Sequence, residues 1–349
     1  KGTQLTEYAG AKPFYGVKTG FNDAFIVDRQ TRDALVAADP RSSEIIRPFL
    51  RGQDVERWVG NWPGLYMIFV RRGLDINQYP AILAHLMRYR TQLEPKPRDW
   101  KGENWAGRKP GSYKWFEIQD PIEYWQDFAR PKIIYQEIQF HPWYAFDSAG
   151  MLGNNKTFFI SSGDLWLLAV LNSPLMWWHN WRYLPHMKDE AMSPVGCLME
   201  SLPIARPSSK QRAEAEAAVQ RLIQIAEMRR AATRTILDWL NVEFEVLKPT
   251  LKLQAPSGLD TDAFVAEVKK SRSKGQKLTA AALGALRDEH TRTITPLRDM
   301  AAEALSLERN LSDLVNTAYG LTPDEVRLMW ETAPPRMPIG CQPSSPSAT

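Results

Sequence analysis

The chain has 349 residues, of which 44% are hydrophobic and 24% are charged, and this length predicts two domains. Its longest apolar run, Leu165–Leu171, is too short for a membrane helix, and Cys197 and Cys341 lack the CxxC spacing of a zinc or redox site. These values argue against a membrane span or a disulfide framework and predict a protein of the reducing cytoplasm. The net charge of +4 permits a polyanionic partner, whose site would have to be a local basic patch.

The first 207 residues have the pattern of short strands joined by turns. Eleven of the 13 tryptophans lie before Pro207. Short β-branched and aromatic runs, bounded by Gly, Pro, Asn or Asp, predict strands at Leu65–Val70, Trp115–Ile118, Lys132–Tyr135, Trp143–Phe146 and Thr157–Ile160. Two helices are predicted among them, Pro80–Leu93 and Asp164–Trp181, the second capped by Asp164 and broken near Pro174. The expected core residues are Leu35, Ile46, Ile68, Ile134, Leu168 and Leu171.

After Pro207 the apolar residues recur at helical spacing. This pattern predicts helices at Ser208–Leu240, Asp260–Arg272, Thr279–His290 and Pro296–Tyr319. Thr322 to Glu325 form a capping-box pattern that predicts one more short helix. We therefore expect an α+β chain, with a mixed β-sheet domain followed by an α-helical bundle or spacer.

The expected division has four parts. Residues 1–13 are a linker, 14–207 the sheet domain, 208–335 the helical domain, and 336–349 a disordered tail that includes the Pro/Ser-rich segment Pro343–Thr349. The chain starts at Lys1 without a charged-then-apolar leader, so no signal peptide is expected.

Arg88–Lys114 is the most informative local patch. It holds eight Lys or Arg residues against three Asp or Glu, interleaved with aromatic residues, prolines and glycines. Basic side chains on such a loop suit phosphates and guanine edges. The alternative is a solvated surface loop pinned by two tryptophans, which composition alone favours.

A second basic run, Lys269–Lys277, lies between two predicted helices, and a solvated loop is the preferred interpretation there. Enzyme signatures are absent from the sequence: it contains no GxGxxG, GxxxxGK[ST], HExxH or GxSxG pattern. The five histidines are scattered and interpreted as structural. The sequence therefore predicts a recognition protein with no catalytic residue and no metal site.

Several segments in the first half resemble one known family. Tyr15–Ile26 (YGVKTGFNDAFI) and Asp39–Val55 (DPRSSEIIRPFLRGQDV) are typical of the target-recognition region of type IIG restriction–modification methyltransferases. Arg130–Tyr135 (RPKIIY), Leu171–Leu175 (LNSPL) and Leu198–Ile204 (LMESLPI) follow in the family's order. The chain is similar to the TaqI-like C-terminal specificity domain of adenine-specific DNA methyltransferases, over about residues 14–206.

The resemblance implies a double-stranded DNA partner and a parent enzyme that methylates adenine with S-adenosyl-methionine. The family's [NDS]-P-P-[YFW] motif and glycine-rich cofactor site do not occur in this sequence. We therefore expect the catalytic domain to be encoded before Lys1, to be a partner of this chain, and to hold the cofactor, while this chain binds none. Because such an enzyme must take its target base out of the duplex, a second surface must hold the DNA and read the flanking bases.

Eleven residues are candidates for that surface. Base reading needs forked donors or amides near turns and strand ends, which points to Arg108, Lys109, Gln136 and Gln139. Phosphate contacts are expected from Lys18, Asn22, Arg51, Arg71, Arg72, Lys114 and Lys156. For Arg51 an internal ion pair with Asp54 or Glu44 is an equal alternative, and for Arg71 and Arg72 solvation at a strand end is the alternative.

Two other functions stay open from the sequence. Abundant Trp and Tyr are also found in carbohydrate-binding modules, although these need no basic loops. The chain is alternatively an interaction subunit that docks a catalytic partner and never touches DNA.

Overall fold

The computed structural model describes residues 2–272 and 278–340 and divides them into two compact units. Unit 1 comprises residues 2–208 and 315–340, and unit 2 comprises residues 209–314. The expected α+β fold class is confirmed, with mixed sheets in unit 1 and long helices in unit 2. The tail Pro343–Thr349 and the basic residues Lys274 and Lys277 lie outside the described residues.

Unit 1 contains three sheets among its described residues. One has four strands in the order β3-β6-β4-β9, one has five in the order β2-β10-β7-β8-β5, and β1 pairs with β11. The pairs β4–β9 and β5–β8 are parallel and all the others are antiparallel. The strands are β1 Thr3–Gln4, β2 Pro13–Tyr15, β3 Ile26–Val27, β4 Ile46–Leu50, β5 Trp58–Val59, β6 Leu65–Ile68, β7 Lys132–Gln136, β8 Tyr144–Asp147, β9 Leu152–Gly153, β10 Thr157–Ile160 and β11 Pro203–Ile204.

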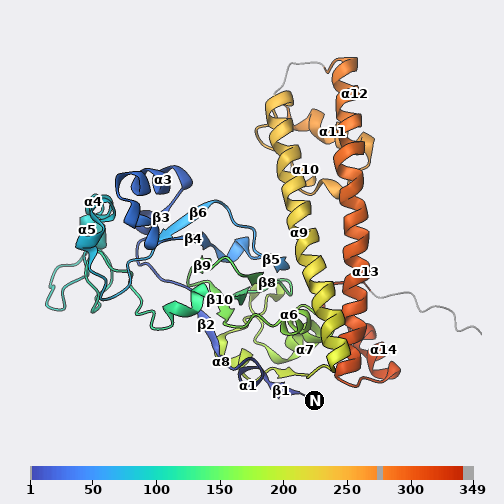
Figure 1. Cartoon of the computed structure of the whole chain (residues 1–349), viewed down its shortest axis with the longest axis horizontal. Helices are drawn as coiled ribbons and strands as arrows, with labels where there is room; N and C mark the ends of the chain where they lie inside the picture. Colours follow the sequence, from blue (N-terminus) through green and yellow to red (C-terminus); the bar gives the residue numbers. More distant parts are fainter. Residues whose placement is uncertain (1, 273–277, 341–349) are drawn as a thin grey trace, which may run out of the picture. The chain divides into compact units, whose positions relative to one another are not determined.

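Short helices surround these sheets (Figure 1). The α-helices of unit 1 are α1 Leu5–Ala9, α2 Asn22–Phe25, α3 Arg29–Ala38, α4 Pro80–Met87, α5 Arg90–Leu93, α6 Leu165–Leu171, α7 Pro174–Tyr183, α8 Gly196–Met199 and α14 Pro323–Glu331. The 3-10 helices are η1 Pro40–Glu44, η2 Gly52–Asp54, η3 Ile76–Gln78, η4 Trp125–Ala129 and η5 Lys188–Glu190. Asp164 caps α6 as predicted, by accepting hydrogen bonds from the amides of Trp166 and Leu167.

The main core of unit 1 joins the four- and five-stranded sheets. Phe49 and Ile68 come from the first sheet, Ile134 and Phe159 from the second, and all four belong to one buried cluster. Burying each such side chain contributes about 1.5–3 kcal/mol. Of the predicted core residues, Leu35 is partly buried at the edge of the cluster and the others are buried.

Unit 2 is helical throughout its regular structure. Two long helices, α9 (Ser209–Phe244) and α13 (Thr295–Ala318), run beside each other, and Arg221 makes two hydrogen bonds of 2.6 and 2.8 Å to Glu303 between them (Figure 1). The remaining elements are α10 Leu251–Gln254, η6 Pro256–Gly258, α11 Thr261–Ser271, α12 Ala280–Glu289 and the π-helical turn η7 His290–Ile294. Their core includes Ile236, Leu240, Phe264, Val268 and Leu286.

The structure differs from the sequence expectations at four places. Residues 115–118 are a loop and not a strand, because Arg108 binds two of their carbonyls. The predicted helix 80–93 is interrupted between α4 and α5. Residues 3–9, expected as a linker, form β1 and α1, with Leu5 fully buried. Residues 315–335, expected in the helical domain, belong to unit 1.

Candidate nucleic-acid interface

The basic loop comprises residues 94–124, which connect α5 to η4. A buried arginine in this loop, Arg108, holds it together. The guanidinium of Arg108 donates five hydrogen bonds, so each of its N–H groups has an acceptor. The acceptors are the carbonyls of Leu93 at 2.8 Å, Thr19 at 2.8 Å, Glu117 at 2.7 Å, Trp115 at 2.8 Å and Lys114 at 3.3 Å. Burial lowers the pKa of Arg108 to about 10, which still leaves the side chain cationic at neutral pH.

Two glycines make this arrangement possible. A Cβ on Gly20, whose φ is +82°, would lie 2.7 Å from Cδ of Arg108. A Cβ on Gly107 would lie 2.1 Å from the carbonyl oxygen of Glu94, which accepts a hydrogen bond from the Arg108 amide. The turn at Gly20 and the loop at Gly107 therefore close on Arg108 only because neither residue has a side chain.

The base-reading expectation for Arg108 is wrong in this structure. The residue is 3% exposed and has no free donor, so its guanidinium cannot form the bidentate contact that reads guanine. Arg108 is instead a structural residue that holds the loop together. Its neighbour Lys109 is exposed, and its ammonium has no hydrogen bond or ion pair with any described residue.

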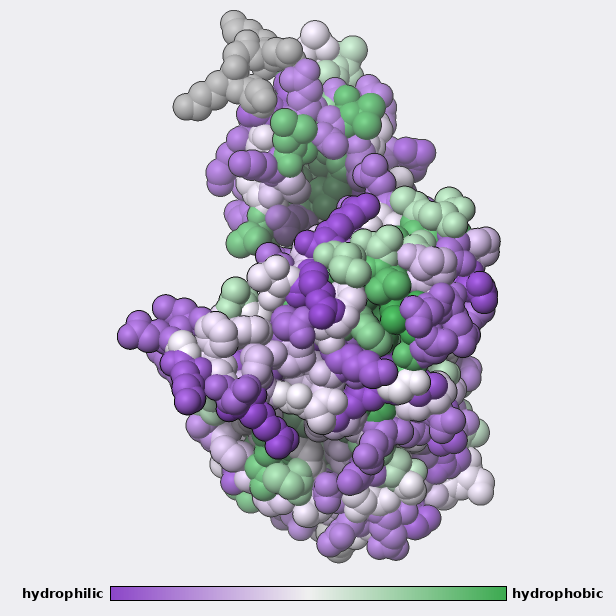
Figure 2. Space-filling model, turned by 90° about the vertical axis from the view of Figure 1, so that its left-hand side faces the viewer, coloured by the Kyte–Doolittle hydropathy of each residue, from purple (hydrophilic) through white to green (hydrophobic). Residues whose placement is uncertain are grey.

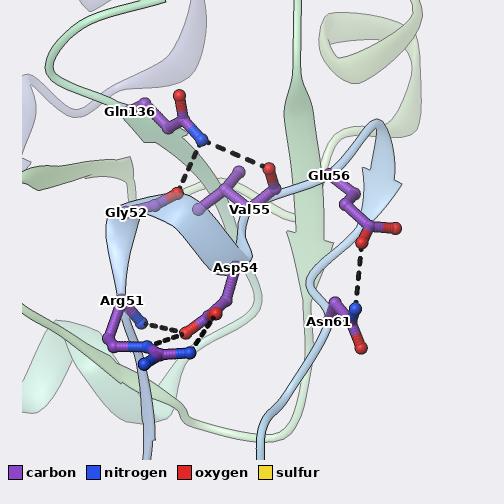
Figure 3. Close-up of polar contacts among 7 residues, drawn as sticks. All are labelled: Arg51, Gly52, Asp54, Val55, Glu56, Asn61 and Gln136. Carbon is purple, nitrogen blue, oxygen red and sulfur yellow. Dashed lines mark hydrogen bonds and ion pairs between the residues drawn. The ribbon is translucent and has the colours of Figure 1, made fainter. Parts of the chain in front are cut away.

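The two candidate glutamines are also used internally. The Gln136 amide donates to the carbonyls of Gly52 at 2.6 Å and Val55 at 3.4 Å, which fastens η2 to β7 (Figure 3). Gln139 is 1% exposed, and its backbone pairs with Met192. Gln139 is buried and the amide group of Gln136 is engaged by two backbone carbonyls, so neither side chain is placed to read a base edge in this structure.

Arg51 forms the internal ion pair that was its alternative interpretation. Its Nε and Nη2 each donate a 2.8 Å hydrogen bond to the carboxylate of Asp54, and its backbone amide donates to the same group at 2.9 Å (Figure 3). These hydrogen bonds raise the pKa of Arg51. Because the bidentate geometry occupies the fork of the guanidinium, Arg51 stabilises the η2 turn and is not placed as a phosphate ligand.

Three further phosphate candidates have internal partners. Arg72 donates to the Ser112 hydroxyl at 3.1 Å and to the Gln119 carbonyl at 2.9 Å, which ties the turn after β6 to the basic loop. The side-chain oxygen of Asn22 accepts a 2.7 Å hydrogen bond from the Thr19 hydroxyl. Lys156 pairs with Glu137 at 2.7 Å, but its side chain is 60% exposed, and such surface pairs are weak enough to exchange for a phosphate.

Four of the eleven candidates remain available to a ligand. Lys18, Lys109 and Lys114 have no ion pair with any described residue, and Lys114 lies 5.6 Å from the centre of the Phe116 ring. Arg71 lies over the Trp125 ring at 4.4 Å without a carboxylate partner among the described residues. Lys109 and Lys114 follow Arg108 in the basic loop, so the buried guanidinium holds the backbone that carries both ammonium groups.

The side of unit 1 that carries α4 and α5 faces the viewer in Figure 2, and its nearest surface is predominantly hydrophilic. The aromatic residues of the basic loop pack on the loop itself: Trp100 meets Trp105 edge-on at 4.9 Å, and the Trp105 indole donates to the Glu94 carbonyl at 3.0 Å. Arg90 covers the Trp115 ring at 4.2 Å. These rings stiffen the loop and do not form the open, flat platform that a sugar-binding site needs.

Sequence reasoning missed Arg47, because a single arginine in a strand gives no local signal. Arg47 on β4 and Arg71 after β6 both line a cavity of about 400 Å³ in unit 1. The Arg47 side chain is exposed and has no hydrogen bond or ion pair with any described residue.

In residues 2–272 and 278–340, no three histidine, cysteine, aspartate or glutamate side chains are grouped so as to hold a metal ion. Within the same ranges, no helix combines the length and the apolar character needed to cross a membrane.

Comparison with known proteins places a named domain in this region. Residues 47–204 match the TaqI-like C-terminal specificity domain, so this part of the chain is similar to that domain. The match includes Arg108, Lys109 and Lys114 and begins after the Tyr15–Ile26 motif. Residues 208–315 match a domain of unknown function, DUF8810.

Among solved structures, the chain is similar to the type IIL restriction–modification enzyme MmeI, which was solved in complex with DNA. The two are 14% identical with a TM-score of 0.49, over 93% of this chain and 35% of the enzyme. The chain thus spans about a third of the length of that relative. No curated protein matches the chain.

Proposed function

We propose that this chain is the sequence-specific double-stranded DNA recognition module of an adenine-specific DNA methyltransferase of a restriction–modification system. The observation that supports this most strongly is the match of residues 47–204 to the TaqI-like specificity domain. In this proposal residues 14–207 hold the duplex, and the helical residues 209–314 of unit 2 are a spacer or docking arm.

The proposed contact surface is the basic loop around Arg108. Lys109 and Lys114 neutralise backbone phosphates, and Lys18 extends the positive surface beside the Gly20 turn, whose Thr19 carbonyl is bound by Arg108. Arg108 does not contact DNA in this proposal, because all its donors are occupied; it holds the backbone that carries the two lysines. Phosphate contacts fix the register of the module on the duplex. Other side chains contact the base edges once the loop is bound to the backbone.

The methyl transfer itself belongs to a partner. A catalytic domain with S-adenosyl-methionine would act on the adenine that this module orients, in the cytoplasm, where the substrate DNA lies. No residue of this chain is proposed to bind the cofactor or to perform the chemistry.

The test is the salt dependence of duplex binding by the full chain, measured by fluorescence anisotropy. Each phosphate contact contributes about 0.9 to the slope of log K against log salt, so Lys109→Gln with Lys114→Gln should lower the slope by about 2. Lys188→Gln, an exposed lysine on η5, is the control and should change it little. Unchanged slopes in the double variant, or binding that ignores salt, would argue against the proposed surface.

A further inference from the structure

A cavity in unit 1 lies near the basic loop and is lined by both charged and apolar side chains. Its volume of about 400 Å³ lies within the range of about 300–1,000 Å³ of small-ligand pockets. It opens between β4, the turn after β6, η4 and the turn after β8, so it lies at the junction of the two main sheets.

Two guanidinium groups line this cavity without acidic partners. The Arg47 side chain has no hydrogen bond or ion pair with any described residue, and the Arg71 guanidinium lies over the Trp125 ring at 4.4 Å without a carboxylate partner among those residues. The indole face orients the Arg71 guanidinium while leaving its N–H donors free. Paired arginines with free forks are a common arrangement for binding phosphate oxygens.

One carboxylate also lines the cavity, and it is already engaged. Glu44 accepts a 2.9 Å hydrogen bond from the hydroxyl of Tyr79, which is itself a lining residue. Burial raises the pKa of Tyr79, so its hydroxyl stays protonated and keeps donating. Two free cations therefore face one carboxylate whose negative charge is partly compensated.

The rest of the wall is apolar. Ile45, Phe69, Phe128 and Leu152 line it, and all four belong to the main core of unit 1. A wall that is charged at one part and apolar at another suits a ligand with a phosphate and a flat, weakly polar ring system.

We propose that this cavity binds one nucleotide, with its phosphate between Arg47 and Arg71 and its base against the apolar wall. Trp125 is a positioning residue that acts through Arg71. The bound nucleotide is either one nucleotide of a DNA strand, displaced from the stacked bases, or a free nucleotide in solution. The first source rests on the proposed function, and the second does not.

The cavity and the basic loop share a short segment of chain. Ile118 donates a 2.9 Å hydrogen bond to the carbonyl of Val70, and the Gly73 amide donates to Glu117 at 3.1 Å. Arg71 faces the cavity within this turn, whereas Arg72 binds the loop. A strand on the loop would thus lie next to the mouth of the cavity.

The experiment titrates the full chain with deoxyadenosine 5′-monophosphate, deoxyadenosine and inorganic phosphate by calorimetry. The monophosphate should bind at least tenfold more tightly than either fragment. Arg47→Gln with Arg71→Gln should weaken it at least tenfold, whereas Lys188→Gln, an exposed lysine on η5 outside the cavity lining, should leave it unchanged. Equal binding by the double variant, or no binding by the wild-type chain at millimolar nucleotide, would overturn the proposal.

A second readout follows the chain labelled with 5-fluorotryptophan. The Trp125 signal, identified by its loss in Trp125→Phe, should shift on addition of the monophosphate, and an unmoved signal would contradict the site. Saturating duplex then separates the sources: displacement of the monophosphate indicates a strand nucleotide, and simultaneous binding indicates free nucleotide. A chain that binds monophosphate but no duplex would contradict the proposed function while supporting this site.

Discussion

The Nη1 atom of Arg108 donates a 2.8 Å hydrogen bond to the backbone carbonyl of Thr19, a residue 89 positions earlier in the chain. The same guanidinium binds four carbonyls at the start and end of its own loop. Ordering a long loop costs conformational entropy, and the hydrogen bonds of Arg108 hold the two ends of this loop together. The geometry of the exposed lysines therefore depends on a buried arginine.

Arg108→Ala should destabilise unit 1 by about 3 kcal/mol or more, because it leaves several buried carbonyls without their donors and each costs about 1–3 kcal/mol. Arg98→Ala removes an exposed arginine from the same loop and should change stability by no more than about 0.5 kcal/mol. Chemical denaturation of both variants measures the difference. An Arg108→Ala chain of wild-type stability would refute the structural role.

Gly20→Ala tests the close approach to Arg108. Gly64 has a similar φ of +78°, but nothing lies within 4 Å of a Cβ placed there, so Gly64→Ala reports backbone strain alone. Because the Gly20 methyl group would also meet Cδ of Arg108, Gly20→Ala should cost about 1–3 kcal/mol more than the control. Denaturant midpoints compare the two, and equal losses would show that the approach is not tight.

The buried pair of Lys132 and Asp147 gives a third prediction. Both side chains are 1% exposed, and burial lowers the pKa of Lys132. Lys132→Met should destabilise unit 1 by about 3–5 kcal/mol because it leaves the Asp147 carboxylate buried without a cation.

Adding Asp147→Asn should restore part of that loss, since it removes the buried charge and its amide oxygen still accepts from the Ala149 amide, although the Met151 amide loses its acceptor. Thermal unfolding of the single and double variants checks this order. A double variant less stable than Lys132→Met alone would contradict the account.

His85 predicts how stability depends on pH. The ring is buried and hydrogen bonded to the Ala24 carbonyl at 3.0 Å, and burial lowers its pKa below 6.5. Below pH 6.5 the unfolded chain binds a proton that the folded chain does not, so stability falls as pH drops from about 6.5 through the folded pKa. Burial also lowers the pKa values of His141 and His179, which add to the same trend.

His85→Gln should therefore show a smaller fall in Tm between pH 7 and pH 5 than the wild-type chain. Differential scanning calorimetry across that range measures it, and an identical slope in the variant would argue against a titrating His85.

The regular elements were the most predictable part of the chain, because they depend on local patterns. The capping box from Thr322 to Glu325 was confirmed at the start of α14, and β10 has the predicted bounds Thr157–Ile160. Residues 115–118 have the composition of a strand, yet Arg108 donates to the carbonyls of Trp115 and Glu117. These hydrogen bonds take the place of those that a neighbouring strand would make.

The candidate site was less predictable, for a physical reason. Sequence places Arg108 in a polar loop, where exposure is the ordinary expectation, and nothing local indicates that carbonyls from Thr19 to Glu117 converge on it. Arg51 was nearer to prediction, because Asp54 lies three residues away and an ion pair at that spacing is a local pattern. Arg47 became a candidate only because the fold places it in the lining of the same cavity as Arg71.

The most direct test of DNA recognition is selection of bound duplexes from a randomised library by the full chain, followed by sequencing. The account predicts one enriched motif, which Lys109→Gln with Lys114→Gln binds more weakly while keeping the same base preferences. A bound pool with no enriched motif, or no bound duplex at low salt from a folded chain, would contradict it.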